Sequence, residues 1–312
     1  MAYYIVAGMG RSGIAAARLI LETGDSVILF DENEKADTEA AALKIFDGLE
    51  TDEIDDGQAE DDAAAAGGDD VGSDSLAEED NDDEALLEFA LGELSQEQID
   101  RALACVISPG ISIHRPWVKA LRDANVPVIS EIELAWECSA GRLAAITGTN
   151  GKTTTTTLTG ELFATVDQEV YTLGNIGIPY TGEALKMSDD AVTALEVSSF
   201  QLETIDAFRP DVSAILNITP DHLDRHGSMA EYIRLKESIT ANQRAEDVCV
   251  LNHEDEELRR FGEELKARED APRVFFFSSL HELDEGIFLK DGMITVRRNG
   301  AEAELIRTDE LQ

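Results

Sequence analysis

The run Gly148-Thr149-Asn150-Gly151-Lys152-Thr153-Thr154 constrains the fold of this chain more than any other feature. It follows a short apolar segment, 143–146, and precedes a threonine-rich segment that can open a helix. A strand, a glycine turn, a lysine and a hydroxyl at a helix start form a phosphate cradle, because backbone N–H groups and the helix N-terminus attract anionic oxygens. The sequence therefore predicts an α/β fold with a nucleotide phosphate site at this loop.

The spacing of this phosphate loop differs from the general pattern G-x-x-x-x-G-K-[ST], which needs a glycine where Ile146 stands. Lys152 can still add a point charge to terminal phosphates, and the hydroxyl of Thr153 can hold Mg²⁺. The spacing Gly-x-x-Gly-Lys-Thr therefore indicates a nucleotide enzyme of a class other than the standard P-loop NTPases.

A second glycine turn, Gly8-x-Gly10-x-x-Gly13, follows a predicted strand at 3–7, and Asp31 follows a predicted strand at 26–30. This pattern matches the dinucleotide fingerprint, in which an acid about 20 residues further on binds a sugar. A UDP-sugar diphosphate fits the same geometry as well as NAD does. Because no hydride-transfer chemistry follows in the sequence, two nucleotide sites favour ATP plus a nucleotide-carrying substrate over an NAD oxidoreductase.

The length of 312 residues favours two domains, which we expect at 1–140 and 141–312. Residues 47–84 consist of Asp, Glu, Ala, Gly and Ser with almost no large apolar side chains, so we predict a disordered acidic insertion. A partner-binding acidic segment is the alternative. The segment 85–99 is predicted to be helical.

The formal net charge of −40 argues against binding to nucleic acid through a basic face. No apolar run reaches the ~18 residues of a membrane span, and the N-terminus reads as a strand rather than a signal, so we expect a cytoplasmic protein without membrane contact. The acidic surface also suggests a saline cytoplasm. A melting temperature that does not rise with KCl would contradict that hypothesis.

Polar side chains stand at the ends of three further predicted strands. Asn175, Glu196 and His222 each lie at or after the end of an apolar segment, where ligands bind in open α/β sheets. Glu196 suits Mg²⁺, with a lysine-paired carboxylate as the alternative, and His222 suits a second metal, with a capping or core histidine as the alternative. By spacing alone, Lys236 on a predicted helix at 229–240 is a surface lysine.

Together these segments resemble the Mur ligases, the ATP-dependent amide ligases of peptidoglycan precursor synthesis. The phosphate loop has the family's short spacing, and three other segments are similar to its D-glutamate-adding branch. They are Ser108-Pro109-Gly110-Ile111, Gly174-Asn175-Ile176-Gly177 and Glu196-Val197-Ser198-Ser199-Phe200-Gln201-Leu202. The resemblance covers nearly the whole chain outside the acidic segment. It implies an N-terminal Rossmann-like domain for a UDP-linked substrate, followed by a P-loop-type central ATPase domain.

The resemblance also implies site residues. Lys152, Glu196, His222 and Lys236 are expected to be catalytic, with one Mg²⁺ on Thr153 and Glu196. A second Mg²⁺ is expected on His222 and Lys236, a lysine that is carbamylated by CO₂ in this family. The ATP phosphates are expected on Gly148, Thr149, Asn150, Gly151, Lys152, Thr153 and Thr154. The UDP-linked substrate is expected on Gly10, Arg11, Ser12, Gly13, Asp31, Ser108, Pro109, Gly110, Asn175 and His222.

The implied reaction joins UDP-N-acetylmuramoyl-L-alanine to D-glutamate. ATP phosphorylates the terminal carboxylate of the substrate, the amine of D-glutamate attacks the resulting acyl phosphate, and phosphate leaves. We expect a monomer. The alternatives are a Mur-type ligase for another amino acid, such as L-alanine, and a nucleotide-binding module without ligase chemistry.

Three features depart from the family pattern. The acidic segment is not part of it, and Arg234 and Leu235 stand where small residues usually precede the lysine at position 236. The family also continues, beyond the position of Gln312, with a Gly-x-His-Asn segment and a third domain that binds D-glutamate. We therefore expect these 312 residues alone to have little ligase activity.

Overall fold

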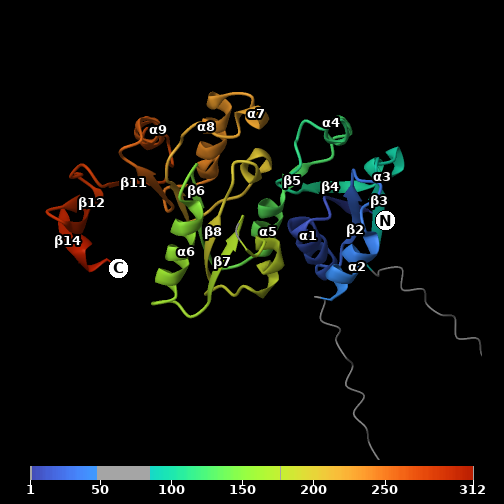
Figure 1. Cartoon of the computed structure of the whole chain (residues 1–312), viewed down its shortest axis with the longest axis horizontal. Coiled ribbons are helices and arrows are strands. Elements are labelled where there is room, and N and C mark those ends of the chain that lie inside the picture. Colours follow the sequence, from blue (N-terminus) through green and yellow to red (C-terminus); the bar gives the residue numbers. More distant parts are fainter. Residues whose placement is uncertain (1, 48–84, 176, 312) are drawn as a thin grey trace, which may run out of the picture.

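The computed structural model describes residues 2–47, 85–175 and 177–311. The chain builds two sheets one after the other, and the sheets lie side by side along the long axis of the molecule (Figure 1). The predicted disordered insertion falls outside the described residues except for Asp47, and so does Ile176.

The first sheet is parallel and has the strand order β3-β2-β1-β4-β5. Its strands are β1 Tyr3–Ala7, β2 Ser26–Asp31, β3 Leu87–Leu91, β4 Ala102–Ile107 and β5 Val128–Ser130. The helices of this half are α1 Arg11–Glu22, α2 Thr38–Phe46, α3 Gln96–Asp100, α4 Pro116–Asp123 and α5 Glu131–Cys138. This is the doubly wound order, in which the winding direction reverses between β1 and β4 and opens a ligand crevice at that point.

The helix predicted at 85–99 is wrong. Residues Leu87–Leu91 form an edge strand that pairs in parallel with β2, and only Gln96–Asp100 is helical. The segment is rich in Leu, Ala and Glu, which favour helix locally. Pairing with the open edge of β2, about 60 residues earlier in the chain, overrides that preference, because strand formation depends on the neighbouring strand more than on composition.

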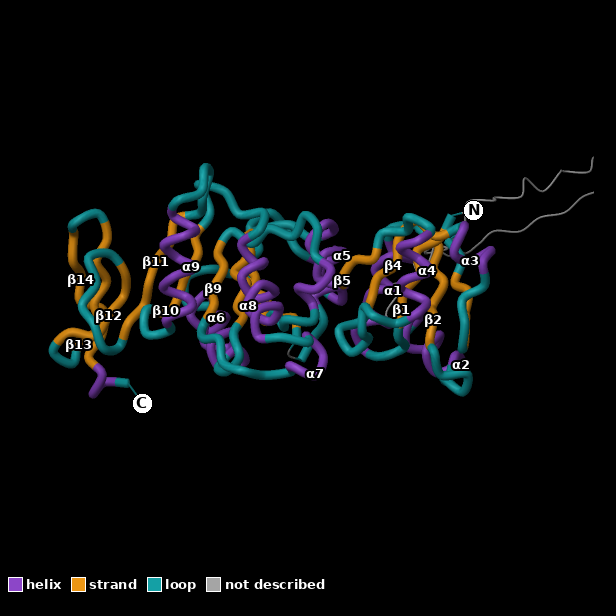
Figure 2. Tube along the Cα trace, turned by 90° about the horizontal axis from the view of Figure 1, so that it is seen from above, coloured by secondary structure: helices purple, strands orange, loops and turns teal. Residues whose placement is uncertain are grey.

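The second sheet has nine strands in the order β14-β13-β12-β11-β10-β9-β6-β8-β7. They are β6 Arg142–Thr147, β7 Val170–Gly174, β8 Val192–Glu196, β9 Val212–Ile215, β10 Val248–Asn252, β11 Arg273–Ser278, β12 Gly286–Lys290, β13 Met293–Arg298 and β14 Ala301–Arg307. The last three pair antiparallel and lie at the end of the molecule away from the first sheet (Figure 2). The α-helices are α6 Lys152–Phe163, α7 Leu223–His226, α8 Met229–Glu237 and α9 Glu256–Lys266. Short 3-10 turns are η1 Tyr180–Gly182, η2 Ala184–Lys186, η3 Gln201–Thr204, η4 Ser238–Thr240 and η5 Thr308–Glu310.

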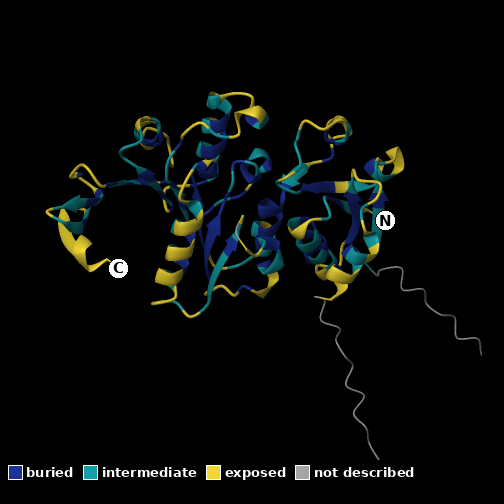
Figure 3. Cartoon of the chain, viewed as in Figure 1, coloured by how far each residue is buried: buried dark blue, intermediate teal, exposed yellow. Residues whose placement is uncertain are grey.

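The two halves share a hydrophobic core around α5, which packs against α1 of the first half and η1 of the second. Burial is densest along the central strands and this junction, whereas β14 is exposed along its whole length (Figure 3). None of the described helices is long and apolar enough to cross a membrane.

The register of the second sheet gathers the polar strand ends. Ile146 at the end of β6 pairs with Glu196 at the end of β8, and Gly174 at the end of β7 pairs with the same residue. Thr147 pairs with Ile215 of β9 on the other side. The phosphate loop therefore begins between the carboxyl ends of its two neighbouring strands.

Candidate functional site

The phosphate loop joins β6 to the first residue of α6. Gly151 has φ +83°, a left-handed value that glycine adopts without strain, and it caps the helix that Lys152 begins. The Nζ of Lys152 donates hydrogen bonds of 2.9 Å to the carbonyls of Gly148 and Thr149. The lysine therefore lies over its own loop, as the sequence requires for a cation that meets phosphates there.

Glu196 is the point where three strand ends meet. It is 2% exposed, its Oε2 accepts 2.7 Å from the hydroxyl of Thr153, and its Oε1 accepts 2.8 Å from Nδ2 of Asn175. Its partners in this structure are therefore a hydroxyl and an amide, not the lysine that the sequence left open. A carboxylate with a hydroxyl beside it, next to a phosphate loop, is an oxygen donor set that suits Mg²⁺.

Lys236 lies beneath the phosphate loop rather than on the surface, so the interpretation from spacing alone is wrong. It is 1% exposed, and its Nζ donates 2.9 Å to the carbonyl of Gly148 and lies 4.7 Å from the ring centre of Tyr232. Burial, together with the nearby charge of Lys152, lowers the pKa of Lys236 to about 7. A large share of this side chain is therefore a neutral amine near neutral pH.

His222 stands at the edge of this cluster. Its backbone has φ +50°, the Nε2 lies 3.5 Å from a carboxylate oxygen of Asp221, and its side chain is 52% exposed. The ring packs against Phe200 with centroids 5.0 Å apart. It occupies the N-cap position of α7 without a side-chain cap, so the core and capping alternatives do not hold. Thr153 and Asn175 both contact Glu196, and Lys152 and Lys236 both contact the carbonyl of Gly148. His222 instead contacts Phe200 and Asp221.

Asn217 is a site residue to which the sequence assigned no role. Its Oδ1 accepts 2.8 Å from the backbone N–H of Asn150, and its Nδ2 donates 3.0 Å to the carbonyl of the same residue. The backbone N–H of Thr149 donates 2.9 Å to the carbonyl of Asn217. This residue therefore fixes the phosphate loop from the end of β9. Its signal was an amide directly after an apolar strand.

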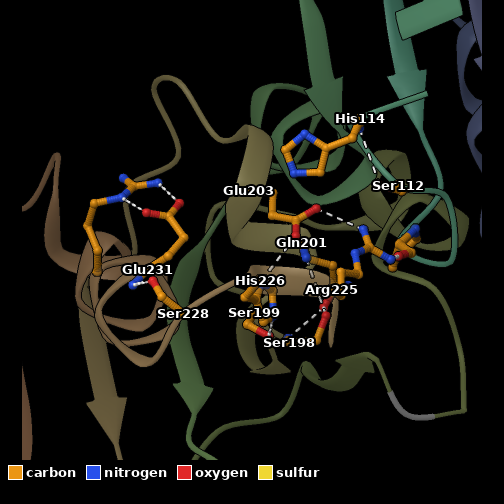
Figure 4. A network of polar contacts seen from close by, with 12 residues as sticks. Ser112, His114, Ser198, Ser199, Gln201, Glu203, Arg225, His226, Ser228 and Glu231 are labelled. Carbon is orange, nitrogen blue, oxygen red and sulfur yellow. Dashed lines mark hydrogen bonds and ion pairs between the residues drawn. The ribbon is translucent and has the colours of Figure 1, made fainter. Parts of the chain in front are cut away.

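Arg225 was also missed, and it connects the two halves of the molecule. Its guanidinium donates 2.8 Å to the carbonyls of Pro109 and Ile111 in the first half. It also forms a 2.8 Å ion pair with Glu203 (Figure 4). The guanidinium carbon lies 4.0 Å from the ring centre of Phe200. Because these partners are distant in sequence, no local pattern indicates this bridge.

His226 lies in the same network (Figure 4). Its Nε2 is 3.0 Å from the hydroxyl of Ser199, and its Nδ1 is 3.3 Å from a carboxylate oxygen of Glu203. The contacts from serine to histidine to glutamate are those of a hydrolase triad, but all three side chains are buried, so no substrate can reach the serine. We therefore assign this network to holding η3 and α7 beside the phosphate loop.

A cavity of about 450 Å³ opens at the reversal point of the first sheet. Gly13 has no room for a side chain there, because a Cβ would lie 1.8 Å from the carbonyl oxygen of Gly8. Asp31 accepts 3.1 Å from the backbone N–H of Met9, so it braces the glycine turn. The lining includes Gly10, Arg11, Ser12, Asp31, Ser108, Pro109, Gly110 and Asn175.

A second cavity of about 200 Å³ shares Arg11, Ser12, Pro109 and Asn175 with the first and continues toward the end of β7. Its wall includes Glu131, which is 2% exposed and accepts 2.8 Å from Nε2 of Gln201. Burial raises the pKa of Glu131 to about 7, against that hydrogen bond. The shared lining places the two cavities next to each other, and both reach Asn175, which contacts Glu196.

Comparison with known proteins identifies the family. Residues 146–310 match the family described as the Mur ligase middle domain. The chain belongs to the Mur ligase family. Among curated relatives, a UDP-N-acetylmuramoylalanine--D-glutamate ligase of Lachnoclostridium phytofermentans is 41% identical over 99% of this Mur ligase chain. A ligase of the same name from Pelotomaculum thermopropionicum is 38% identical over 98%. The chain spans 59% and 58% of the length of these relatives.

Solved structures agree on the fold. A UDP-N-acetylmuramate:L-alanyl-gamma-D-glutamyl-meso-diaminopimelate ligase from Neisseria meningitides has a TM-score of 0.53 at 16% identity, covering 97% of this Mur ligase chain and 86% of that one. A murein peptide ligase from Psychrobacter arcticus has a TM-score of 0.52 at 13% identity, covering 98% and 61%. At these identities the likeness supports the arrangement of the two sheets and nothing about substrate.

Proposed function

We propose that this chain supplies the UDP-substrate and ATP sites of a ligase that adds D-glutamate to UDP-N-acetylmuramoyl-L-alanine. The names of the relatives support the substrate. The observation that carries the proposal is the meeting of Thr153 and Asn175 on the carboxylate of Glu196. In this proposal residues 1–140 form the substrate domain and residues 141–312 the ATP domain. We further propose that the protein works as a cytoplasmic monomer.

The ATP phosphates would lie on the phosphate loop from Gly148 to Thr154. The loop delivers backbone N–H groups at the start of α6, and this helix has no acidic residue in its first turn to compete with an anion. Lys152 would leave its loop carbonyls for the terminal phosphates. Its charge would then offset the charge that builds on the transferred phosphoryl group.

Thr153 and Glu196 would hold one Mg²⁺. Mg²⁺ prefers one or two carboxylates together with phosphate oxygens and water, and the 2.7 Å contact shows a hydroxyl and a carboxylate oxygen within reach of one small ion. When bound, the ion would neutralise phosphate charge as a Lewis acid. Asn175 keeps the carboxylate oriented through the other oxygen.

Lys236 is proposed to react with CO₂ and to serve a second Mg²⁺ with His222. The neutral amine attacks the carbon of CO₂, an N–C bond forms as one C=O π bond breaks, and one proton leaves the nitrogen, so the neutral amine becomes a carbamate anion. The low pKa of about 7 supports this step, because only the unprotonated amine is nucleophilic. Burial against Gly148 would place the anion beside the phosphates.

The UDP-linked substrate would occupy the hollow that runs from Asp31 to Asn175. The glycine turn at Gly10 to Gly13 brings backbone N–H groups of α1 toward a diphosphate. The muramoyl-alanine carboxylate would then reach the cluster at Glu196. Water must be excluded from this cluster, because water would hydrolyse the acyl phosphate intermediate before D-glutamate reacts with it.

ADP release tests the proposal in the protein that carries these 312 residues. With ATP, Mg²⁺ and UDP-N-acetylmuramoyl-L-alanine, we expect release to depend on D-glutamate and not on L-alanine. Glu196→Gln should abolish it, and Glu161→Gln, a matched change on the exposed face of α6, should not. Release with L-alanine instead would assign another Mur-type reaction. Nucleotide binding without any release would assign a binding module.

A further inference from the structure

A cluster of metal-ligating side chains lies away from the phosphate loop. His253, Glu254 and His281 each offer one ligand atom, and these atoms lie within 4.8 Å of one another. The first two follow β10, and the third lies in the connection between β11 and β12. These strands belong to the part of the second sheet that lies away from the first sheet (Figure 2). We propose that this cluster is a Zn²⁺ site.

His253 is prepared to act as a ligand. Its Nδ1 is buried and has no hydrogen-bond partner among the described residues, which is costly for a ring nitrogen unless something else binds it. Its backbone N–H donates 2.9 Å to the carbonyl of Phe277, which ties its loop to β11.

Glu254 and His281 are held beside it by one serine. Ser278 donates 2.5 Å from its hydroxyl to Oε1 of Glu254, and its oxygen accepts 2.8 Å from the backbone N–H of His281. Leu280 N–H also donates to Oε1 of Glu254. None of these hydrogen bonds uses Oε2 of Glu254.

Two imidazoles and one carboxylate indicate the metal. This is a three-ligand set that Zn²⁺ accepts, with a fourth position for water. Tetrahedral ligands about 2.0–2.2 Å from Zn²⁺ lie roughly 3.3–3.6 Å apart. Because the ligand atoms lie within 4.8 Å of one another, the set needs to close by at most about 1.5 Å. His281 is exposed and supplies that movement, and the rings of His281 and His253 already lie 5.6 Å apart, centre to centre.

The ion would also connect the β11–β12 connection to the loop after β10, and the loop after β10 contacts the segment that supports the phosphate loop. Asn252 donates 3.0 Å to the carbonyl of Leu216, and Asp255 accepts 2.8 Å from the backbone N–H of Ile218. These contacts flank Asn217. Zn²⁺ at His253 and Glu254 would therefore stiffen the segment that positions the phosphate loop, in addition to stabilising the β10–β12 region.

Zn²⁺ titration of the metal-free protein, made without a polyhistidine tag, tests the site against a chromophoric chelator. We expect one Zn²⁺ to bind and to raise the melting temperature. His281→Ala should weaken binding roughly 10- to 100-fold or more. His114→Ala, at an exposed histidine outside the cluster, should leave the affinity unchanged. Equal Zn²⁺ affinity of wild type and His281→Ala would overturn the proposal.

Co²⁺ provides a second readout that does not depend on folding of a variant. At this site the bound ion should show visible d–d bands of a nitrogen and oxygen environment. Thiolate charge-transfer bands would place the ion on one of the free cysteines, Cys105, Cys138 or Cys249, and would also overturn the proposal.

Discussion

Replacing Lys236 with methionine should stabilise the protein at neutral pH. The pKa of this buried amine is about 7 instead of the ordinary 10.5. At about 1.4 kcal/mol per unit of pKa, this lowered pKa makes the folded protein about 4 kcal/mol less stable at pH 7 than a lysine with its ordinary pKa would. Methionine removes that cost at similar length. It also removes the hydrogen bond to Gly148, worth about 1 kcal/mol. Because Lys152 still donates to the same carbonyl, that oxygen stays bonded.

The net gain is about 3 kcal/mol at pH 7, and its sign follows from proton binding. Between pH 7 and 10.5 the unfolded chain binds more protons at this lysine than the folded protein does, so wild-type stability rises with pH across that window. Lys236→Met lacks this rise. The advantage of the variant should therefore be largest at or below pH 7 and should shrink as the pH rises. Near pH 10.5 the lost hydrogen bond to Gly148 should leave the variant slightly less stable than wild type.

Urea unfolding followed by circular dichroism at pH 7, 8.5 and 10 measures this difference. The buffers must be free of CO₂, because a carbamate would remove the cation. Lys186→Met is the matched control, since that lysine is exposed in a surface ion pair with Glu183 and should change stability by less than about 0.5 kcal/mol. A Lys236→Met variant that is less stable at pH 7, or a gap that does not change with pH, would refute the reasoning.

Three further changes test other parts of the structure. Gly13→Ala places a Cβ 1.8 Å from the carbonyl of Gly8, so UDP binding should fall and thermal unfolding should show a loss of about 1–3 kcal/mol; unchanged binding of UDP would contradict the tight turn. Glu133→Gln replaces one of the two oxygens that accept from the backbone N–H groups of residues 206–208 by an NH₂ group, so the free energy of unfolding in urea should fall by about 2 kcal/mol; an unchanged value would contradict this role. Thr153→Val should weaken Mg²⁺-dependent nucleotide binding roughly 10- to 100-fold without a large change in stability. Nucleotide binding as tight as that of wild type would show that the hydroxyl of Thr153 is not part of the Mg²⁺ site.

The sequence predicted the parts of the fold that local chemistry decides. The glycine turns at Gly8 and Gly148 need a strand before them and a helix after them, and the structure has both at each place. The edge strand Leu87–Leu91 was predicted as helix, because its partner β2 lies far away in the chain. The strand Ala301–Arg307 gave no signal either, since all seven of its residues are exposed and no buried face imposes alternation.

The site residues also fall into those that local sequence predicts and those that it does not. Lys152 and Thr153 are predicted from one loop, and Glu196 from the end of one strand. Spacing alone predicts a surface position for Lys236. Its amine contacts the carbonyl of Gly148, 88 residues earlier, and no residue pattern in its own helix indicates that contact. Asn217 and Arg225 act through backbone groups of distant segments. The place of Asn217 after an apolar strand was a signal for it, whereas no local pattern indicated Arg225.

The bridge made by Arg225 has a consequence for how the two halves can change over time. Its partners at positions 109 and 111 are peptide carbonyls, which every amino acid carries. Replacement of either side chain leaves the acceptor in place as long as the turn keeps its path, whereas replacement of the arginine removes both bonds at once. The first half can therefore accumulate side-chain changes in this turn without losing its attachment. The constraint on the junction falls on one residue of the second half, Arg225.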